Sequence, residues 1–384
     1  MRVRSIASVA GPGFAAVLVL APAAAASDAA RIADLLTAAI VATGEMEATY
    51  EVATADGDDL TVTGFKVALA DGRGSLTLPI LVIGGAGERE GGGFTAARIT
   101  FDGGSATLGD DTVRWATAAI EDAVVPSVDE VRLRARIRPF GQASFGALEI
   151  ARAGDAAPIR VAALGLAVGD MTDGVARDVR VRASGAEVPA SFFTGTIVSA
   201  IIDRLDYRTF TADIATDGDY DTAGDTLSLR KLVVDAVGVG RIDMDGKFSG
   251  LSLLGMIDRE KSAEARASAR LDSMTLRLEN AGLVERVLDM QAEMLGGTRD
   301  DVRFQFVYGA LPFALSFVDN ERFRDQFLVA ATAFLEDPRA LTFRVAPQEP
   351  VPLRQIYRAA RSSPLALPDL LTPDVEANAE RPGP

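Results

Sequence analysis

The sequence predicts an α+β protein in which long antiparallel β-meanders form one or more curved sheets and a helical block lies near the C-terminus. Short segments of alternating apolar and polar residues, separated by Gly and Asp, recur along residues 46–254. After residue 280 the apolar residues return at helical spacing. We therefore expect helices at 29–43, 190–205 and 281–336 to cap or fill the sheet.

Residues 1–26 have the features of a secretory signal peptide. Arg2 and Arg4 precede a short apolar stretch, and Ala24-Ala25-Ala26 before Ser27 is a small-residue cleavage site. No later apolar run reaches the length of a membrane span. We expect a protein exported to a bacterial periplasm, with no integral membrane span after the signal is cleaved.

Charge and composition exclude several function classes. The formal net charge is −15, and removal of the signal with its two arginines makes it −17, which disfavours nucleic acid as a partner. The chain has no Cys, so the fold uses no disulfides. It also has no His, which excludes Ser-His-Asp triads and His-ligated metals. We expect no cofactor.

The first expected domain, residues 27–205, begins with a helix and continues as a β-meander. Ile32, Leu35, Leu36 and Ile40 share one face of the expected helix Ser27–Thr43. The meander begins at residues 46–82, and residues 84–93 are expected to form a Gly-rich loop. Asp102-Gly103 is a hairpin signal, and residues 115–123 are expected to form a short helix closed by Pro126.

Residues 131–137 show the clearest strand pattern in the chain, and the arginines on its polar side are the candidate ligand-binding residues. Val131, Leu133, Ala135 and Ile137 alternate with Arg132, Arg134, Arg136 and Arg138. Four guanidinium groups on one strand face can hold phosphate or carboxylate groups of an anionic ligand. They can equally pair with acids on the next strand or remain exposed. The same alternatives hold for Arg180 and Arg182.

The second expected domain, residues 206–378, begins with a three-strand module at 207–254. Thr209–Ala215 and Thr226–Ala236 alternate as strands, and the phase change at Arg230-Lys231 predicts a β-bulge. Residues 55–78 repeat this pattern, with Leu60, Val62, Phe65 and Val67 matching Leu227, Leu229, Leu232 and Val234. Two interpretations stay open: a duplicated β-module, or two meanders that are merely similar.

The carboxylates of this module suggest two further kinds of site. Asp217, Asp219 and Asp221 match the first half of a calcium loop, but Thr222 and Ser228 stand where Gly and Glu are needed, which favours a solvated turn. Asp-Gly pairs occur at 56, 71, 102, 173, 217 and 245. Paired carboxylates hydrolyse glycosides only when they converge across a cleft, so we interpret these pairs as turns.

The C-terminal part is expected to be mainly helical. Helices around 283–295 and 323–335 are marked by apolar spacing, and Thr298-x-x-Asp301 begins a helix between them that Pro312 should kink or end. The Phe-rich helices at 302–335 form either core packing or an apolar ligand pocket. Residues 341–345 form a strand, and residues 379–384 are expected to be a disordered tail.

The aliphatic alternation that begins at Leu60 and at Leu227, with Gly between its segments, resembles the repeating strands of AsmA-like bacterial envelope proteins. The whole mature chain is also similar to uncharacterised secreted bacterial proteins of this layout. The resemblance covers mainly residues 46–254 and implies a long curved sheet whose apolar groove accommodates lipid. The chain departs from the AsmA pattern in lacking the N-terminal membrane anchor and in its helical block.

Three functions are compatible with the sequence. A non-enzymatic periplasmic protein that binds a lipid-like ligand in a sheet groove predicts a continuous apolar concave face open to solvent. An envelope scaffold that binds a partner protein predicts a closed core and an exposed partner patch. An Asp/Glu-dependent hydrolase, the least favoured, needs two distant carboxylates brought together in a pocket.

Overall fold

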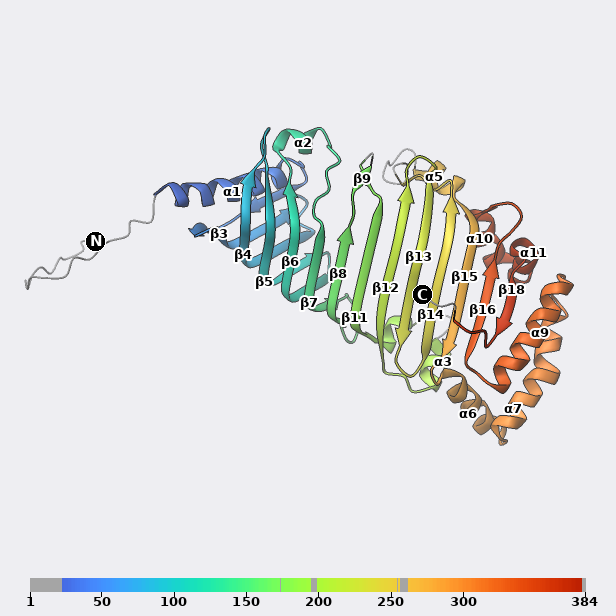
Figure 1. Ribbon diagram of the computed structural model, residues 1–384. Helices are drawn as coiled ribbons and strands as arrows, with labels where there is room; N and C mark the ends of the chain where they lie inside the picture. The colour runs from blue at the N-terminus through green and yellow to red at the C-terminus, as the bar shows by residue number, and fades with distance from the viewer. Residues whose placement is uncertain (1–22, 173, 195–198, 254, 256–261, 382–384) are drawn as a thin grey trace, which may run out of the picture.

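The computed structural model describes residues 23–172, 174–194, 199–253, 255 and 262–381. In this part of the chain, sixteen strands form one antiparallel sheet in which most strands pair with their neighbours in sequence (Figure 1). The order is β1-β3-β4-β5-β6-β7-β8-β11-β12-β13-β14-β15-β16-β18, with β2 on β3 and β17 on β15. The predicted α+β class and the meander order are confirmed.

The strands lengthen after the first pair, and most of the later ones have ten residues or more. Their bounds are β1 Met46–Thr49, β2 Val52–Asp56, β3 Asp59–Leu69, β4 Gly74–Glu88, β5 Phe94–Leu108, β6 Asp111–Val125, β7 Gln142–Ala151, β8 Ile159–Val168, β11 Asp178–Pro189, β12 Thr209–Asp221, β13 Thr226–Ala236, β14 Gly240–Ser249, β15 Arg270–Asn280, β16 Ala340–Val345, β17 Val351–Pro352 and β18 Asp374–Ala377. A separate pair joins β9 Met171–Thr172 to β10 Val175–Ala176.

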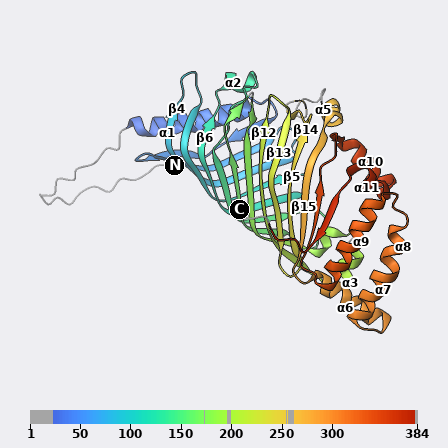
Figure 2. The same cartoon turned by 45° about the vertical axis from the view of Figure 1, so that its right-hand side comes forward.

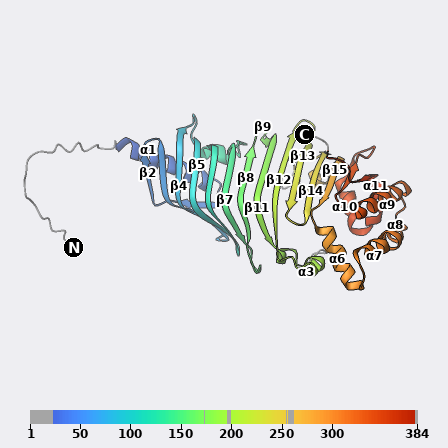
Figure 3. The same ribbon diagram turned by 60° about the horizontal axis from the view of Figure 1, so that its bottom comes forward.

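The described helices lie mainly at the two ends of the sheet (Figures 1 and 3). Their bounds are α1 Ala23–Val41, α2 Val128–Arg132, η1 Ala190–Phe193, α3 Ser199–Arg204, α5 Ser262–Ser268, α6 Leu283–Leu295, α7 Arg299–Gln305, η2 Phe306–Ala310, α8 Leu311–Leu315, α9 Glu321–Glu336, α10 Leu353–Ser362, η3 Pro364–Ala366 and α11 Leu367–Leu371. Figure 2 shows the N-terminal strands running at a steep angle to the C-terminal ones, because the twist of successive strands accumulates across so wide a sheet.

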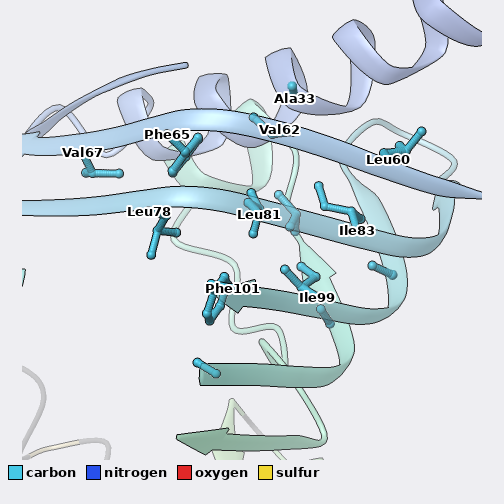
Figure 4. Packing of buried hydrophobic residues seen from close by; sticks show 14 of the residues in the cluster. Ala33, Leu60, Val62, Phe65, Val67, Leu78, Leu81, Ile83, Ile99 and Phe101 are labelled. Atoms are coloured by element: carbon cyan, nitrogen blue, oxygen red, sulfur yellow. The ribbon is translucent and has the colours of Figure 1, made fainter. Parts of the chain in front are cut away.

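The largest core lies between α1 and the N-terminal strands. Figure 4 shows Ala33 of α1 next to Val62 of β3, with Leu81 and Ile83 on the neighbouring strand β4. Phe101 of β5 follows on the next strand. Val62 and Ile83 are fully buried. The predicted N-terminal helix is therefore confirmed, and its apolar face closes this end of the sheet.

The strands before and after residue 205 belong to the same sheet. β11 and β12 pair from Asp178 opposite Asp219 to Pro189 opposite Thr209. The helix expected at 190–205 is interrupted: η1 and α3 are present, and residues 195–198 lie outside the described residues. The division into domains 27–205 and 206–378 stays a prediction. So does the signal peptide: residues 1–22 lie outside the described residues, and 23–26 belong to α1.

Several local predictions are wrong because pairing with neighbouring strands outweighs local sequence preference. Residues 84–88 of the expected Gly-rich loop belong to β4, and Asp245-Gly246, expected to be a turn, lies inside β14. Residues 115–123, expected to be a helix, lie in β6, which pairs with β5 and β7. Asp102-Gly103, expected to be a hairpin, lies inside β5. Asp217–Asp221, expected to be a turn, forms the end of β12, and the turn follows it, where Asp221 accepts a hydrogen bond from the backbone of Ala223.

The predictions for the helical block are largely confirmed. α6 ends at Gly296, which has a positive φ of 68°, and Thr298 and Asp301 form the predicted capping box of α7. The chain then passes through the π-helical turn η2 before α8, which has Pro312 in its first turn and continues to Leu315. The backbone is helical at both junctions of η2, so Pro312 does not end the helical run. The expected effect of the proline is limited to the wider π-helical turn that comes just before it.

Candidate functional site

The four candidate arginines do not share a strand face, because residues 131–137 do not form a strand. Ser127 and Glu130 form a capping box that begins α2, which ends at Arg132, and Arg134 has a positive φ of 52°. Arg132 lies 4.0 Å from Asp129, and Arg138 lies 3.9 Å from Asp170. Arg136 packs against Gly174, and Arg134 is exposed.

The expected strand is therefore wrong, and the reason is visible in the sequence. Ser127-x-x-Glu130 is a helix-start motif, which sets the backbone before the alternating stretch begins. The arginine ladder on which the anion-binding prediction relied is not formed. Binding of an anion by individual members of this set stays a prediction.

The feature that does run through the whole sheet is an apolar face. Residues directly opposite each other in antiparallel strands point to the same side of a sheet, so the pairing register traces each face from strand to strand. One row of directly paired residues is apolar at every strand along the pairing path from β3 to β18, which leaves out β9, β10 and β17. It is Val62, Leu81, Phe101, Ala118, Phe145, Leu164, Ala183, Ile214, Val234, Ile242, Leu278, Leu341 and Ala377.

A second row beside it on the same face is apolar with one exception, Thr216. It is Leu60, Ile83, Ile99, Ile120, Ala143, Leu166, Val181, Thr216, Leu232, Met244, Leu276, Phe343 and Val375. We call the two rows together the apolar face. The predicted bulge at Arg230-Lys231 is confirmed by register shifts on both sides of β13. It returns Leu232 and Val234 to the face on which Leu227 and Leu229 lie.

The described helices cover the two ends of the apolar face but not its middle. At the N-terminal end α1 and its cluster bury Val62 and Leu81. At the C-terminal end Phe327 of α9 lies over Phe343 of β16, with ring centroids 6.3 Å apart. In the described part of the chain no helix packs closely over the middle of β13 and β14, where Ile242 is 41% exposed.

The opposite face of the same strands carries paired charges. Arg230, at the bulge, donates to Asp217 and to Asp219, the latter at 2.9 Å. Arg180 lies 3.8 Å from Asp217 across β11 and β12, which is the cross-strand alternative predicted for it. Arg182 forms no ion pair with any described residue. Two of the three carboxylates that match half of a calcium loop thus hold a guanidinium group.

A second cluster on this polar face joins β13, β14 and β15. Arg241 donates to Asp235 at 3.1 Å and to both oxygens of Asp243 at 2.8 and 2.9 Å. Arg381 reaches Asp243 at 3.2 Å and Glu279 at 2.6 Å. Residues 379–381 of the expected disordered tail are therefore attached to the sheet, and residues 382–384 lie outside the described residues.

These ion pairs shift the acid–base equilibria of the carboxyl groups. Burial alone would raise the pKa of Asp243, but the hydrogen bond and charge of Arg241, with the charge of Arg381, lower it below its ordinary value. Burial would likewise raise the pKa of Glu279, but hydrogen bonds from Arg277 and Arg381 lower it below its ordinary value. Both carboxylates are ionised structural partners, which is the opposite of the raised pKa that a general acid needs.

Hollows along the middle of the sheet lie on this polar side. One of about 510 Å³ is lined by residues of β7 to β14, among them Arg182, Lys231 and Arg241. No group of metal-ligating side chains is found among the described residues. None of the described helices is both long and apolar enough to span a bilayer.

The sequence indicated most strands of the apolar face, though not β6 or β18, and did not identify the rows that cross them. The signal was present, because every strand along the rows except β12 carries two apolar residues in the same phase. It identifies a shared face only when the register of each pair is known, and register depends on turns and bulges that single strands do not show.

Comparison with known proteins gives a partial match. The model of a family described as uncharacterized proteins matches residues 233–378, which run from within β13 through the helical block and past β18. No curated protein is significantly similar to the chain. The match therefore covers the C-terminal, helix-capped end of the sheet and carries no statement of activity.

Proposed function

We propose that this is an exported, non-enzymatic protein that holds a lipid-like ligand, apolar or amphipathic, against the uncovered part of the apolar face. The observation that supports this most strongly is the two apolar rows, which continue from the helix-covered ends across β13 and β14. Exposed aliphatic side chains in a continuous stretch are unfavourable in water. A chain that retains them over several strands of a single sheet has a surface suited to an acyl chain.

The two ends of the apolar face define the length of the proposed site. α1 packs on β1, β2 and β3 at the N-terminal end of the face, and α9 covers it at β16 and β18. The site lies between these helices, along the half-buried Leu232, Met244 and Leu276 and the exposed Ile242. The charged clusters on the opposite face do not enter it, so the ligand is selected mainly by burial of apolar surface.

The test is lipid mass spectrometry on the protein purified without detergent from a periplasmic extract. We expect a lipid to co-purify in a stoichiometric ratio to the protein, and the chemical structure of its headgroup would identify the class of ligand. A folded sample with only background lipid would overturn the proposal. The envelope scaffold, with a partner protein and no small ligand, would then be the better account.

A further inference from the structure

The outward side of α10 is a cationic stripe on an acidic protein. Leu353, Ile356 and Ala359 are half-buried on its inner side. Arg354, Tyr357, Arg358 and Arg361 are exposed and follow the spacing i, i+3, i+4 and i+7, which places them on one helix face. The helix contains no acidic residue, in a chain whose formal net charge is −15.

No described carboxylate neutralises the three arginines of this stripe. Most arginines of the polar face are held by acids, as Arg230 and Arg241 are. Within the described ranges, neither Arg354, Arg358 nor Arg361 forms an ion pair. Arg361 donates to the hydroxyl of Tyr357 at 3.0 Å and lies 5.6 Å from the centre of its ring. Among the described residues these guanidinium groups have no carboxylate partner, and being exposed they are placed to meet an external anion.

A second surface at the same end of the molecule is aromatic. Phe304 and Tyr308 have ring centroids 4.7 Å apart, and Phe313 and Phe317 have centroids 5.2 Å apart. Phe313 is 69% exposed and Phe317 56%. The opposite side of this segment packs on α9 through Leu311, Leu315 and Val318, so the rings point away from the core. Large exposed aromatic clusters are rare on proteins that do not bind a partner or a membrane.

The two surfaces are joined through α11. The side-chain amide of Asn320, at the start of α9 and just after Phe317, donates to the carbonyl of Pro368 in α11 at 3.1 Å. α11 in turn packs against α10. Figures 1 and 3 show α10, α11 and the α7–α9 helices gathered at the C-terminal end of the sheet.

We propose that this end of the protein docks on the surface of a phospholipid bilayer that contains anionic lipid. Guanidinium groups bind phosphate in bidentate fashion, and aromatic side chains are favoured at the boundary between headgroups and acyl chains. The acid-free arginine stripe and the exposed Phe and Tyr side chains lie on helices gathered at the same end of the sheet, and together they offer both interactions. The docking surface lies apart from the uncovered apolar face and does not depend on what that face binds.

Vesicle flotation with the full-length exported protein tests this proposal. Vesicles of phosphatidylcholine alone are compared with vesicles that also contain phosphatidylglycerol. The native protein should float with the anionic vesicles, and binding should weaken as salt is raised. Each arginine near an anionic surface is expected to contribute about fivefold to binding, so the triple variant R354Q/R358Q/R361Q should bind on the order of 100-fold more weakly.

The matched control removes three exposed cations elsewhere, in K66Q/R98Q/K247Q, and should bind as the native protein does. The variant F313S/F317S should also lose vesicle binding while keeping its folded circular dichroism spectrum. Three results would overturn the proposal: no flotation of the native protein, an equal loss in the control, or binding of the α10 stripe to polyglutamate but not to vesicles. The last result would assign the stripe to an acidic protein partner.

Discussion

Ile242 of β14 and Leu278 of β15 lie directly opposite each other on the apolar face, and Ile242 keeps 41% of its surface exposed. Their sequence neighbours Arg241 and Glu279 are also opposite each other, on the other side of the sheet. This pair of strands thus separates an uncovered aliphatic surface from a polar one on which Arg241 and Glu279 both form ion pairs.

We expect Ile242→Glu to reduce co-purifying lipid at least about tenfold, because a carboxylate cannot be buried against an acyl chain without a large desolvation penalty. Lipid content per folded protein, measured by mass spectrometry, checks this. Val237→Glu is the matched control, since Val237 is 74% exposed in the turn between β13 and β14 and lies off the apolar face. Equal lipid content in the two variants would contradict the proposed site.

The sequence was sufficient to predict features that depend on local pattern. The bulge at Arg230-Lys231 appears as a phase change in aliphatic residues, and the start of α7 appears as Thr298-x-x-Asp301. Both are determined by neighbours within a few residues. The N-terminal helix was predicted for the same reason, since Ile32 and Leu36 recur at helical spacing.

Features that depend on distant partners were not predicted. The Ala-rich residues 116–119 have high helix propensity, and only pairing with β5 and β7 makes them a strand. The candidate site was missed in a similar way. Arg132 to Arg138 alternate as a strand would, but the chain there connects two strands that already pair with each other. The apolar face needs the register of the whole sheet.

The core beneath α1 should be the most sensitive part of the N-terminal strands. Ile83 of β4 is fully buried, and replacing it with alanine should lower the free energy of unfolding by about 2–5 kcal/mol. Ile80→Ala on the same strand is the control, because Ile80 is 41% exposed and should change stability by less than about 1 kcal/mol. Urea unfolding followed by fluorescence of Trp115, the single tryptophan, measures both. Equal losses would contradict the burial of Ile83 in this core.

The cluster around Asp243 predicts a dependence of stability on acid. Because the folded-state pKa of Asp243 is lowered, its contribution is present above the unfolded pKa, near 4, and is lost as pH falls through the lower folded pKa. We expect Asp243→Asn to cost about 1 kcal/mol at pH 7 and progressively less below about pH 4. Asp245 lies on the same strand, is exposed and forms no ion pair with any described residue. Asp245→Asn should therefore change the free energy of unfolding little at either pH. A cost for Asp243→Asn that stays constant down to pH 3 would contradict the ionised cluster.

Continuity of the sheet across residue 205 predicts that its two halves unfold together. β11 and β12 pair along most of their length, so loss of one half would expose a long row of unpaired backbone groups on the other. Leu271 of β15 is buried, and Leu271→Ala should lower stability by about 2–5 kcal/mol. Trp115 lies before residue 205, in the half that does not contain Leu271. In the Leu271→Ala variant, the urea midpoint followed by Trp115 fluorescence should nevertheless fall by the same amount as the midpoint followed by far-UV circular dichroism. If Trp115 fluorescence keeps its native midpoint while circular dichroism shows an earlier transition, the halves unfold separately. The division at residues 205 and 206 would then be one of independent domains, and the paired edge would be only their interface.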